Sequence, residues 1–305
     1  MAQAGSQAAL GLTAAAAWGG GDFAGGIAAK SAAPTIIVAV AHGFSLLLLI
    51  SAAALLHLSY VGHELFGLGS GVLCGGGLIA LYSALANGSM GLTAAISGVL
   101  TALVPVLYSL VCEAWFAGGY PSVLRLTGFA VAAAAIWLVA YAPTDRAAPK
   151  SAGYTAAGVD GHKVGLAVAA GLSFGGMLIL MHRAASYGVL QALVEMRLMS
   201  MLIAAIAGIF VWLSRRGRNA DWRGFPAGRV LLLAMVAGVL DTMGNLLYLF
   251  AARVGRLDVT AVLSSLYPAG TMLLAAGVLK ERTSKSQAAG MVLAIAAIFL
   301  ISLGG

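Results

Sequence analysis

Charged side chains are scarce in this sequence. They make up 9% of its 305 residues, against 61% hydrophobic residues, and the mean hydropathy is +0.98. This composition excludes a soluble globular domain and, with its helix-length apolar runs, indicates an all-α integral membrane protein that crosses the bilayer several times. Basic residues outnumber acidic ones by 17 to 10, which in a soluble protein would suggest a nucleic-acid partner. Here they lie between apolar runs, as topology signals do, so we expect no nucleic acid.

Cysteine and cofactor motifs are also rare. The chain has two cysteines, Cys74 and Cys112, each alone inside an apolar segment, which indicates buried thiols and supports neither a disulfide framework nor a metal site. The glycine-rich nucleotide-binding loop G-x-x-x-x-G-K-[S/T] does not occur, which excludes a pump built on that motif. We therefore expect no cofactor and no metal.

Long apolar runs take up most of the chain. A transmembrane helix needs about 20 such residues. On that criterion the sequence predicts about ten spans, at 8–28, 34–56, 66–86, 92–112, 122–142, 163–182, 188–213, 229–252, 258–279 and 286–304. The longest polar stretch, 143–162, lies near the middle and predicts a linker between a first half, 1–142, and a second half, 163–305.

The two halves share a weak internal repeat. Short matches follow one another in the same order in both: Leu81-Tyr82, Pro105, Gly128 and 134–138 in the first half, and Leu247-Tyr248, Pro268, Gly290 and 296–300 in the second. Because five spans per half is an odd number, the second copy enters the membrane from the opposite side. The sequence thus predicts two inverted five-helix repeats, an arrangement that places a substrate site near the midplane between them.

One carboxylate, Asp241, lies near the middle of the eighth predicted span. A charge at bilayer depth costs at least about 2.5 kcal/mol, so it normally faces the protein interior or a water-filled cavity. Asn245 and Tyr248 follow at positions i+4 and i+7, which places all three side chains on one helix face. Such a polar face is typical of the lining of a transport path.

Three motifs give the chain a family resemblance. They are Trp18-Gly19 with Asp22-Phe23 in the first span, the run from Leu247-Tyr248 to Ala252, and the stretch from Leu263 to Pro268 that continues through Leu279-Lys280-Glu281-Arg282 to Gln287 and Gly290. With these motifs the sequence resembles the ten-helix, EamA-type transporters of the drug/metabolite transporter superfamily. The resemblance implies two inverted five-helix bundles around a central cavity that moves small metabolites or drugs across a cytoplasmic membrane.

A second carboxylate, Asp22, lies in the first span inside a run of glycines that allows neighbouring helices to approach closely. Asp22 and Asp241 each have two interpretations. Each pairs with a structural Arg or Lys, or each serves transport, because a carboxylate in a partly dry cavity suits a proton carrier. We hypothesise that one or both couple transport to protons or bind a cationic group.

Arg197, in the seventh span, supplies a cation at bilayer depth. It could neutralise Asp22 or Asp241 across the bundle, or it could hold an anionic substrate. Glu195 is two residues away and therefore points to a different side of the helix, so we expect no pair between the two.

Four aromatic residues, Trp18, Tyr82, Tyr248 and Tyr267, lie within the predicted spans and not at their ends. Tyr82 and Tyr248 are equivalent in the repeat. They could face each other across the pseudo-twofold axis and line the cavity with the other two, or they could pack in the core.

Two prolines, Pro105 and Pro268, stand inside predicted spans, where each frees a backbone carbonyl four residues earlier. The sequence allows two interpretations, a packing kink or a hinge. Gly67, Gly71 and Gly75 recur every four residues and predict a smooth surface for tight helix packing.

Together these features predict a secondary transporter that moves a small solute across the cytoplasmic (inner) membrane by alternating access, with protons as one possible coupling ion. Its expected partners are the solute and the lipid bilayer, and we expect no enzymatic activity. The alternative is an intramembrane aspartyl protease-like enzyme, since 19–22 fit a Gly-x-Gly-Asp pattern and Asp241 could supply the second carboxylate. A passive channel is a third possibility.

The orientation in the membrane has conflicting indications. One side of the predicted topology carries most of the Lys and Arg: Lys30, Arg146, Lys150, Lys163, Arg215, Arg216, Arg218, Arg223, Arg229, Lys280, Arg282 and Lys285. The other side carries Arg125, Arg183, Arg253 and Arg256. The positive-inside rule makes the first side cytoplasmic and both termini external, whereas the family resemblance implies internal termini.

Overall fold

The computed structural model is built from helices. It describes residues 2–57, 65–87, 90–112, 122–140, 161–215, 226–280 and 285–303, and no strand occurs within these ranges. The helices are α1 (Ala2–Ala29), α2 (Pro34–Leu55), α3 (Leu65–Asn87), α4 (Met90–Cys112), α5 (Val123–Ala140), α6 (Gly161–Ala184), α7 (Val189–Arg215), α8 (Gly228–Val254), α9 (Leu257–Ser264), α10 (Tyr267–Val278) and α11 (Lys285–Leu303).

The described residues include 6 stretches that are long and apolar enough to cross a membrane. These are α2, α3, α6, α7, α8 and the run Val259–Val278, which covers most of α9 and all of α10. Most helix limits agree with the predicted spans to within a few residues. The exception is α1, which begins at Ala2 and not near residue 8. The predicted linker, 143–162, lies outside the described residues except for its last two, which begin α6.

The predicted span 258–279 agrees with the apolar run Val259–Val278, but it is not one continuous helix. The structure divides this stretch into α9 and α10, with Ser265 and Leu266 between them. Pro268 explains the break, because inside a helix its ring would clash with the carbonyl group of Ser264. It lies instead in the first turn of α10, where its missing N–H is not needed. Pro105, by contrast, lies inside the continuous helix α4.

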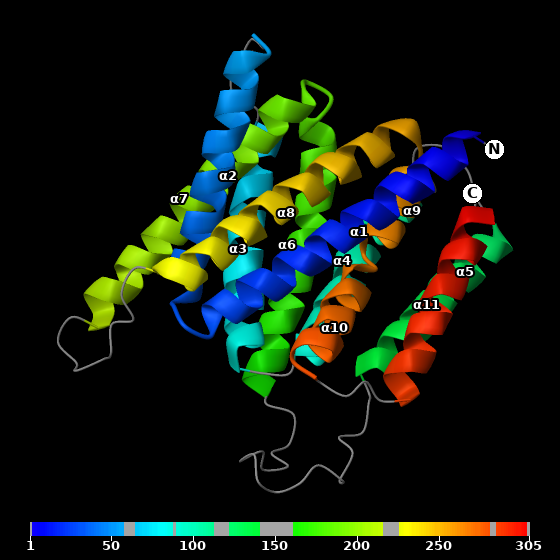
Figure 1. The fold of residues 1–305 in the computed structure, drawn as a ribbon. Coiled ribbons are helices and arrows are strands. Elements are labelled where there is room, and N and C mark those ends of the chain that lie inside the picture. The colour runs from blue at the N-terminus through cyan, green and yellow to red at the C-terminus, as the bar shows by residue number, and fades with distance from the viewer. Residues whose placement is uncertain are drawn as a thin grey trace, which may run out of the picture.

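The two halves of the chain are intertwined. Helix α1 packs along α8 and α10, α3 packs along α6 and α7, α4 packs along α6, and α2 packs along α7 and α8 (Figure 1). Helices α5 and α11 form a separate pair at one edge of the bundle (Figure 1). Most of the extensive helix contacts therefore join one half to the other, and the largest cluster of buried side chains contains residues of both halves.

Glycine makes the contact between α3 and α7 possible. A Cβ atom on Gly71 would lie 2.5 Å from the carbonyl oxygen of Met196, and one on Gly75 would lie 2.9 Å from that of Ser200. A Cβ on Gly67 would overlap the side chain of Glu195. The predicted stripe of small residues is thereby confirmed. Its effect is to bring the backbone of α7, and with it Arg197, close to α3.

Candidate functional site

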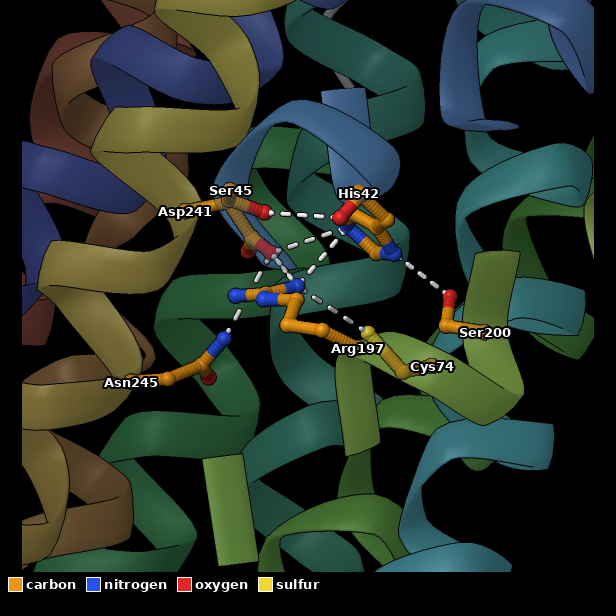
Figure 2. A network of polar contacts seen from close by, with 7 residues as sticks. All are labelled: His42, Ser45, Cys74, Arg197, Ser200, Asp241 and Asn245. Carbon is orange, nitrogen blue, oxygen red and sulfur yellow. Dashed lines mark hydrogen bonds and ion pairs between the residues drawn. The ribbon is translucent and has the colours of Figure 1, made fainter. Parts of the chain in front are cut away.

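An ion pair between α7 and α8 lies at the centre of the bundle. Arg197 is fully buried, and its Nη1 lies 2.5 Å from Oδ2 of Asp241, whose side chain is 16% exposed (Figure 2). The sequence left Asp22 and Asp241 open as partners of Arg197, and the structure selects Asp241. Glu195 faces elsewhere on α7, toward Gly67 of α3, and accepts a hydrogen bond from Gln191.

His42 of α2 joins this pair in a defined tautomer. Its Nε2 lies 2.8 Å from Nη1 of Arg197, and its Nδ1 lies 2.6 Å from Oγ of Ser200 (Figure 2). A guanidinium group only donates hydrogen bonds, so Nε2 must be the acceptor. The proton is then on Nδ1 and is donated to Ser200, which makes His42 neutral. The 3.3 Å approach of Nε2 to Asp241 is therefore not an ion pair.

Asn245 and Cys74 complete the network. Asn245 lies one turn after Asp241 on α8, and its Nδ2 donates to Oδ2 of Asp241 at 3.4 Å. The Sγ atom of Cys74, on α3, lies 3.9 Å from Nη1 of Arg197. Tyr248, predicted on the same face as Asp241 and Asn245, instead packs against Trp18 of α1 with ring centroids 5.8 Å apart.

The network contains three residues of types that bind metals, but the cation among them is the guanidinium group of Arg197. The donor atoms of His42, Cys74 and Asp241 all lie within 4.8 Å of one another. The Nη1 atom of Arg197 contacts all three of these side chains, so a positive charge already occupies their common centre. We therefore assign no metal to this cluster.

Beside the network lies a small cavity. Its volume is about 30 Å³, room for about two water molecules. Its walls come from α1, α3, α4, α6, α8 and α10, and the lining residues are Trp18, Asp22, Cys74, Leu78, Thr101, Phe174, Met177, Leu178, Asp241 and Tyr267. Both halves of the chain thus contribute to its wall.

Four of the predicted site residues line this cavity: Asp22, Asp241, Trp18 and Tyr267. The other four, Asn245, Tyr248, Tyr82 and Arg197, lie outside its lining. Tyr82 and Tyr248 are both fully buried, and they pack against α1 at separate places, Tyr82 on Gly25 and Tyr248 on Trp18.

The glycines around Asp22 bring three helices together. A Cβ atom on Gly19 would lie 2.6 Å from the carbonyl oxygen of Tyr267 in α10, and one on Gly21 would lie 3.4 Å from the backbone nitrogen of Asp241 in α8. The predicted close approach of neighbouring helices is thereby confirmed. It sets Trp18 edge-on to Tyr267, at 6.2 Å and 89°, on the cavity wall.

Sequence reasoning did not identify several residues of this site. For His42, the available signal was its position as a polar residue inside an apolar span. Cys74, Thr101, Phe174 and Met177 resemble ordinary core residues in the sequence. Their place in the cavity wall depends on how the helices pack.

Comparisons with known proteins agree with this architecture. Residues 163–303 match the model of the EamA-like transporter family. An uncharacterized protein of Methanocaldococcus jannaschii is 36% identical over 75 residues, which are 25% of this chain and 55% of that one, so the chain spans about half the length of this relative. A solved structure described only as the crystal structure of a protein shares the fold over 98% of this chain and 97% of its own, with a TM-score of 0.72 at 16% identity.

The family match covers the second half of the chain, which carries Arg197, Asp241 and Tyr267. It agrees with the apolar helices in indicating a multi-pass membrane protein. Residues 163–303 therefore resemble the EamA-like transporter family, which is consistent with the drug/metabolite transporter superfamily.

Proposed function

We propose that this protein is a secondary transporter that moves a small solute across the cytoplasmic membrane by alternating access. The observation that carries the proposal is the cavity between the halves, lined by two carboxylates and two aromatic rings: Asp22, Asp241, Trp18 and Tyr267. The match of residues 163–303 to the EamA-like transporter family supports transport of small solutes. At about 30 Å³ the cavity has room for water but not for an organic molecule, so it must widen to load a solute.

We further propose that the chain is an inverted repeat of ten spans, with α9 and α10 forming the ninth. Under that correspondence, each helix of the first half matches the helix five spans later. The contact of α1 with α8 then corresponds to that of α3 with α6, and the contact of α3 with α7 corresponds to that of α2 with α8. The pairs α2–α7 and α5–α11 correspond to themselves. This symmetry of contacts supports a pseudo-twofold axis through the cavity region.

The proposed hinges are Pro105 and the break before Pro268. The ring of Pro268 packs against Gly98 of α4, where a Cβ atom would overlap it. At the same level, the hydroxyl groups of Tyr267 and Ser97 are 2.8 Å apart. If α10 moves about Ser265 and Leu266, Tyr267, which lines the cavity, therefore changes its position relative to α4.

Coupling to protons follows from the chemistry of the Arg197–Asp241 pair. A proton on Asp241 removes the charge that holds the guanidinium group, so protonation and the ion pair exclude each other. Because the two residues lie on α7 and α8, proton binding would loosen the contact between these helices. Asn245, Tyr248 and Tyr82 support the site from behind the cavity wall.

The enzyme alternative gains no support from this site. An aspartyl dyad needs two carboxylates that share one proton. Asp241 is instead held by Arg197 at 2.5 Å, and the matched family consists of transporters. A passive channel would need a continuous wide path, whereas the cavity has a volume of only about 30 Å³.

Transport into proteoliposomes, screened over a panel of small metabolites with and without an imposed pH gradient, tests the proposed function. We expect at least one solute to accumulate only with the gradient, and Asp241→Asn to abolish this accumulation. Asp241→Glu, which keeps the charge, serves as the matched control, and gel filtration verifies that each variant is folded. Uptake that ignores the gradient and survives in a folded Asp241→Asn variant would contradict proton coupling through Asp241. If no solute in the panel moves, the proposed function fails.

A further inference from the structure

The carboxyl group of Asp22 is buried, and it has no partner among the residues that the structure describes. The residue is 7% exposed and lines the cavity. Among the residues that the structure describes, none forms a hydrogen bond or an ion pair with it. Asp241, on the neighbouring helix α8, has Arg197, His42 and Asn245 around it. The two acids of the cavity are therefore in different situations.

The groups that face Asp22 supply no positive charge. Those that interact with it electrostatically are Asp241 of α8, Tyr82 of α3 and Tyr267 of α10. Arg197 forms its ion pair with Asp241, and His42 is neutral in the tautomer that its hydrogen bonds require. With both carboxylates ionised, the site would hold two negative charges and one positive charge. The surplus negative charge is that of Asp22.

An ionised carboxylate that is buried without a counter-charge is strongly unfavourable. Two occupants remove this cost of burying the Asp22 carboxyl group: a proton bound to it, or a cationic ligand beside it. At its volume of about 30 Å³ the cavity is too small for an organic molecule, so the proton is the suitable occupant. In a widened cavity, a ligand cation can replace it at the same net charge.

We propose that Asp22 binds the ammonium group of an organic cation and exchanges it one for one with a proton. This inference rests on the proposed transport function and names the substrate class of the same site. When the cavity opens, Asp22 gives up its proton to water as the ammonium group arrives. When the cation leaves, Asp22 takes up a proton again, so the buried site stays electrically balanced in both states.

The walls next to Asp22 suit an ammonium group that carries an apolar substituent. Trp18 lies one turn before Asp22 on α1 and meets Tyr267 edge to face, so two aromatic rings share the cavity wall with the carboxyl group. Aromatic faces attract ammonium groups, most strongly where water is excluded. Phe174 and Met177 of α6 add an apolar wall for the rest of the molecule.

An anionic substrate fits this cavity less well. The cavity's lining contains two acids and no Arg or Lys. The Nε and Nη2 atoms of Arg197 have no partner, but the residue is fully buried behind the lining and its Nη1 is engaged by Asp241. A zwitterion would need both Asp22 and these two nitrogen atoms, so it is the competing occupant that an experiment must separate.

Four aromatic probes of similar size provide the test: 2-phenylethylammonium, 3-phenylpropionate, phenylalanine and 2-phenylethanol. Each is added to the purified protein in weakly buffered detergent solution while pH is recorded, and uptake is measured in proteoliposomes. We expect 2-phenylethylammonium alone to release protons, about one per molecule bound. Its apparent affinity is expected to fall about tenfold per pH unit in the acid range, where protons compete for Asp22.

Substitutions then assign the exchange to Asp22. We expect Asp22→Asn to abolish proton release and to lower ammonium uptake more than about tenfold, because one partner of a buried charge pair is lost. Asp22→Glu should retain both signals in weaker form. Glu195→Gln, the same chemical change at a buried acid outside the cavity, should leave both unchanged.

The remaining outcomes separate the two proposals. Gradient-driven uptake of the anion or the zwitterion, with the ammonium probe inactive, would overturn the assignment of Asp22 but leave the transport function standing. Ammonium binding that releases no proton, or that persists in a folded Asp22→Asn variant, would also overturn the assignment. If neither these probes nor any solute of the metabolite panel moves across the membrane, the transport function itself fails.

Discussion

Replacing Arg197 by methionine is expected to destabilise the protein by about 3–5 kcal/mol, the cost of removing one partner of a buried ion pair. Arg197 is fully buried, and its guanidinium group contacts Asp241, His42 and Cys74 at once. Methionine fills similar space but leaves Asp241 without its cation. Thermal unfolding in detergent, followed by circular dichroism or by a thiol-reactive dye, measures the effect.

Two further variants show whether charge is the cause. Combining Arg197→Met with Asp241→Asn removes both charges, and we expect it to recover part of the lost stability. Arg253→Met is the matched control, because Arg253 lies at the exposed end of α8 and donates a hydrogen bond to the carbonyl oxygen of Ala185. Its expected cost is within about 1 kcal/mol. Equal melting temperatures for Arg197→Met and the unchanged protein would contradict the ion pair.

Gly238→Ala is expected to destabilise the protein by about 1–3 kcal/mol through overpacking. A Cβ atom on Gly238 would overlap the carbonyl group of Ala41, so the backbones of α2 and α8 cross in direct contact at this point. Backbone atoms cannot rotate out of the way as the end of a flexible side chain can, so one of the two helices must shift. Ala41 precedes His42, and Asp241 lies three residues after Gly238, so the shift would also separate His42 from Asp241.

The matched control for this substitution is Gly76→Ala in α3. A Cβ atom at Gly76 has nothing within 4 Å. Alanine there should be neutral or stabilise the helix by about 0.5–1 kcal/mol. Thermal unfolding of the two variants should therefore show shifts of different sign or clearly different size. A Gly238→Ala variant that is as stable as Gly76→Ala would contradict the close crossing of α2 and α8.

The positions of the helices could largely be predicted from the sequence, because hydropathy averaged over about 20 residues is a strong signal. The break between α9 and α10 could not. The apolar run continues across Ser265 and Leu266, and a proline inside a span is compatible with either a kink or a break. The position of Pro268 in the first turn of α10 depends on tertiary packing against Gly98.

The candidate site, like the fold, could be predicted only in part from the sequence. Asp22, Asp241 and Arg197 are conspicuous in the sequence because charges at bilayer depth are rare. Their pairing could not be predicted, since either acid was compatible with Arg197 until α7 and α8 were positioned. The two acids look alike in the sequence, whereas in the structure one is held by a guanidinium group and the other lines the cavity with no partner in the described part of the chain. The proposed roles of the two acids rest on this difference.

The central claim is that the cavity between the halves opens alternately to the two sides of the membrane. Cys74 provides a direct probe of it, because its side chain is buried in this structure and lines the cavity. In a Cys112→Ser background, Cys74 is the chain's one remaining cysteine. The measurement is its labelling by a membrane-impermeant maleimide in right-side-out and in inside-out vesicles, with Cys74→Ser as the blank. Alternating access predicts slow labelling from both sides, and slower labelling when a transported solute is present. Labelling from one side only, or no labelling while transport continues, would contradict the account.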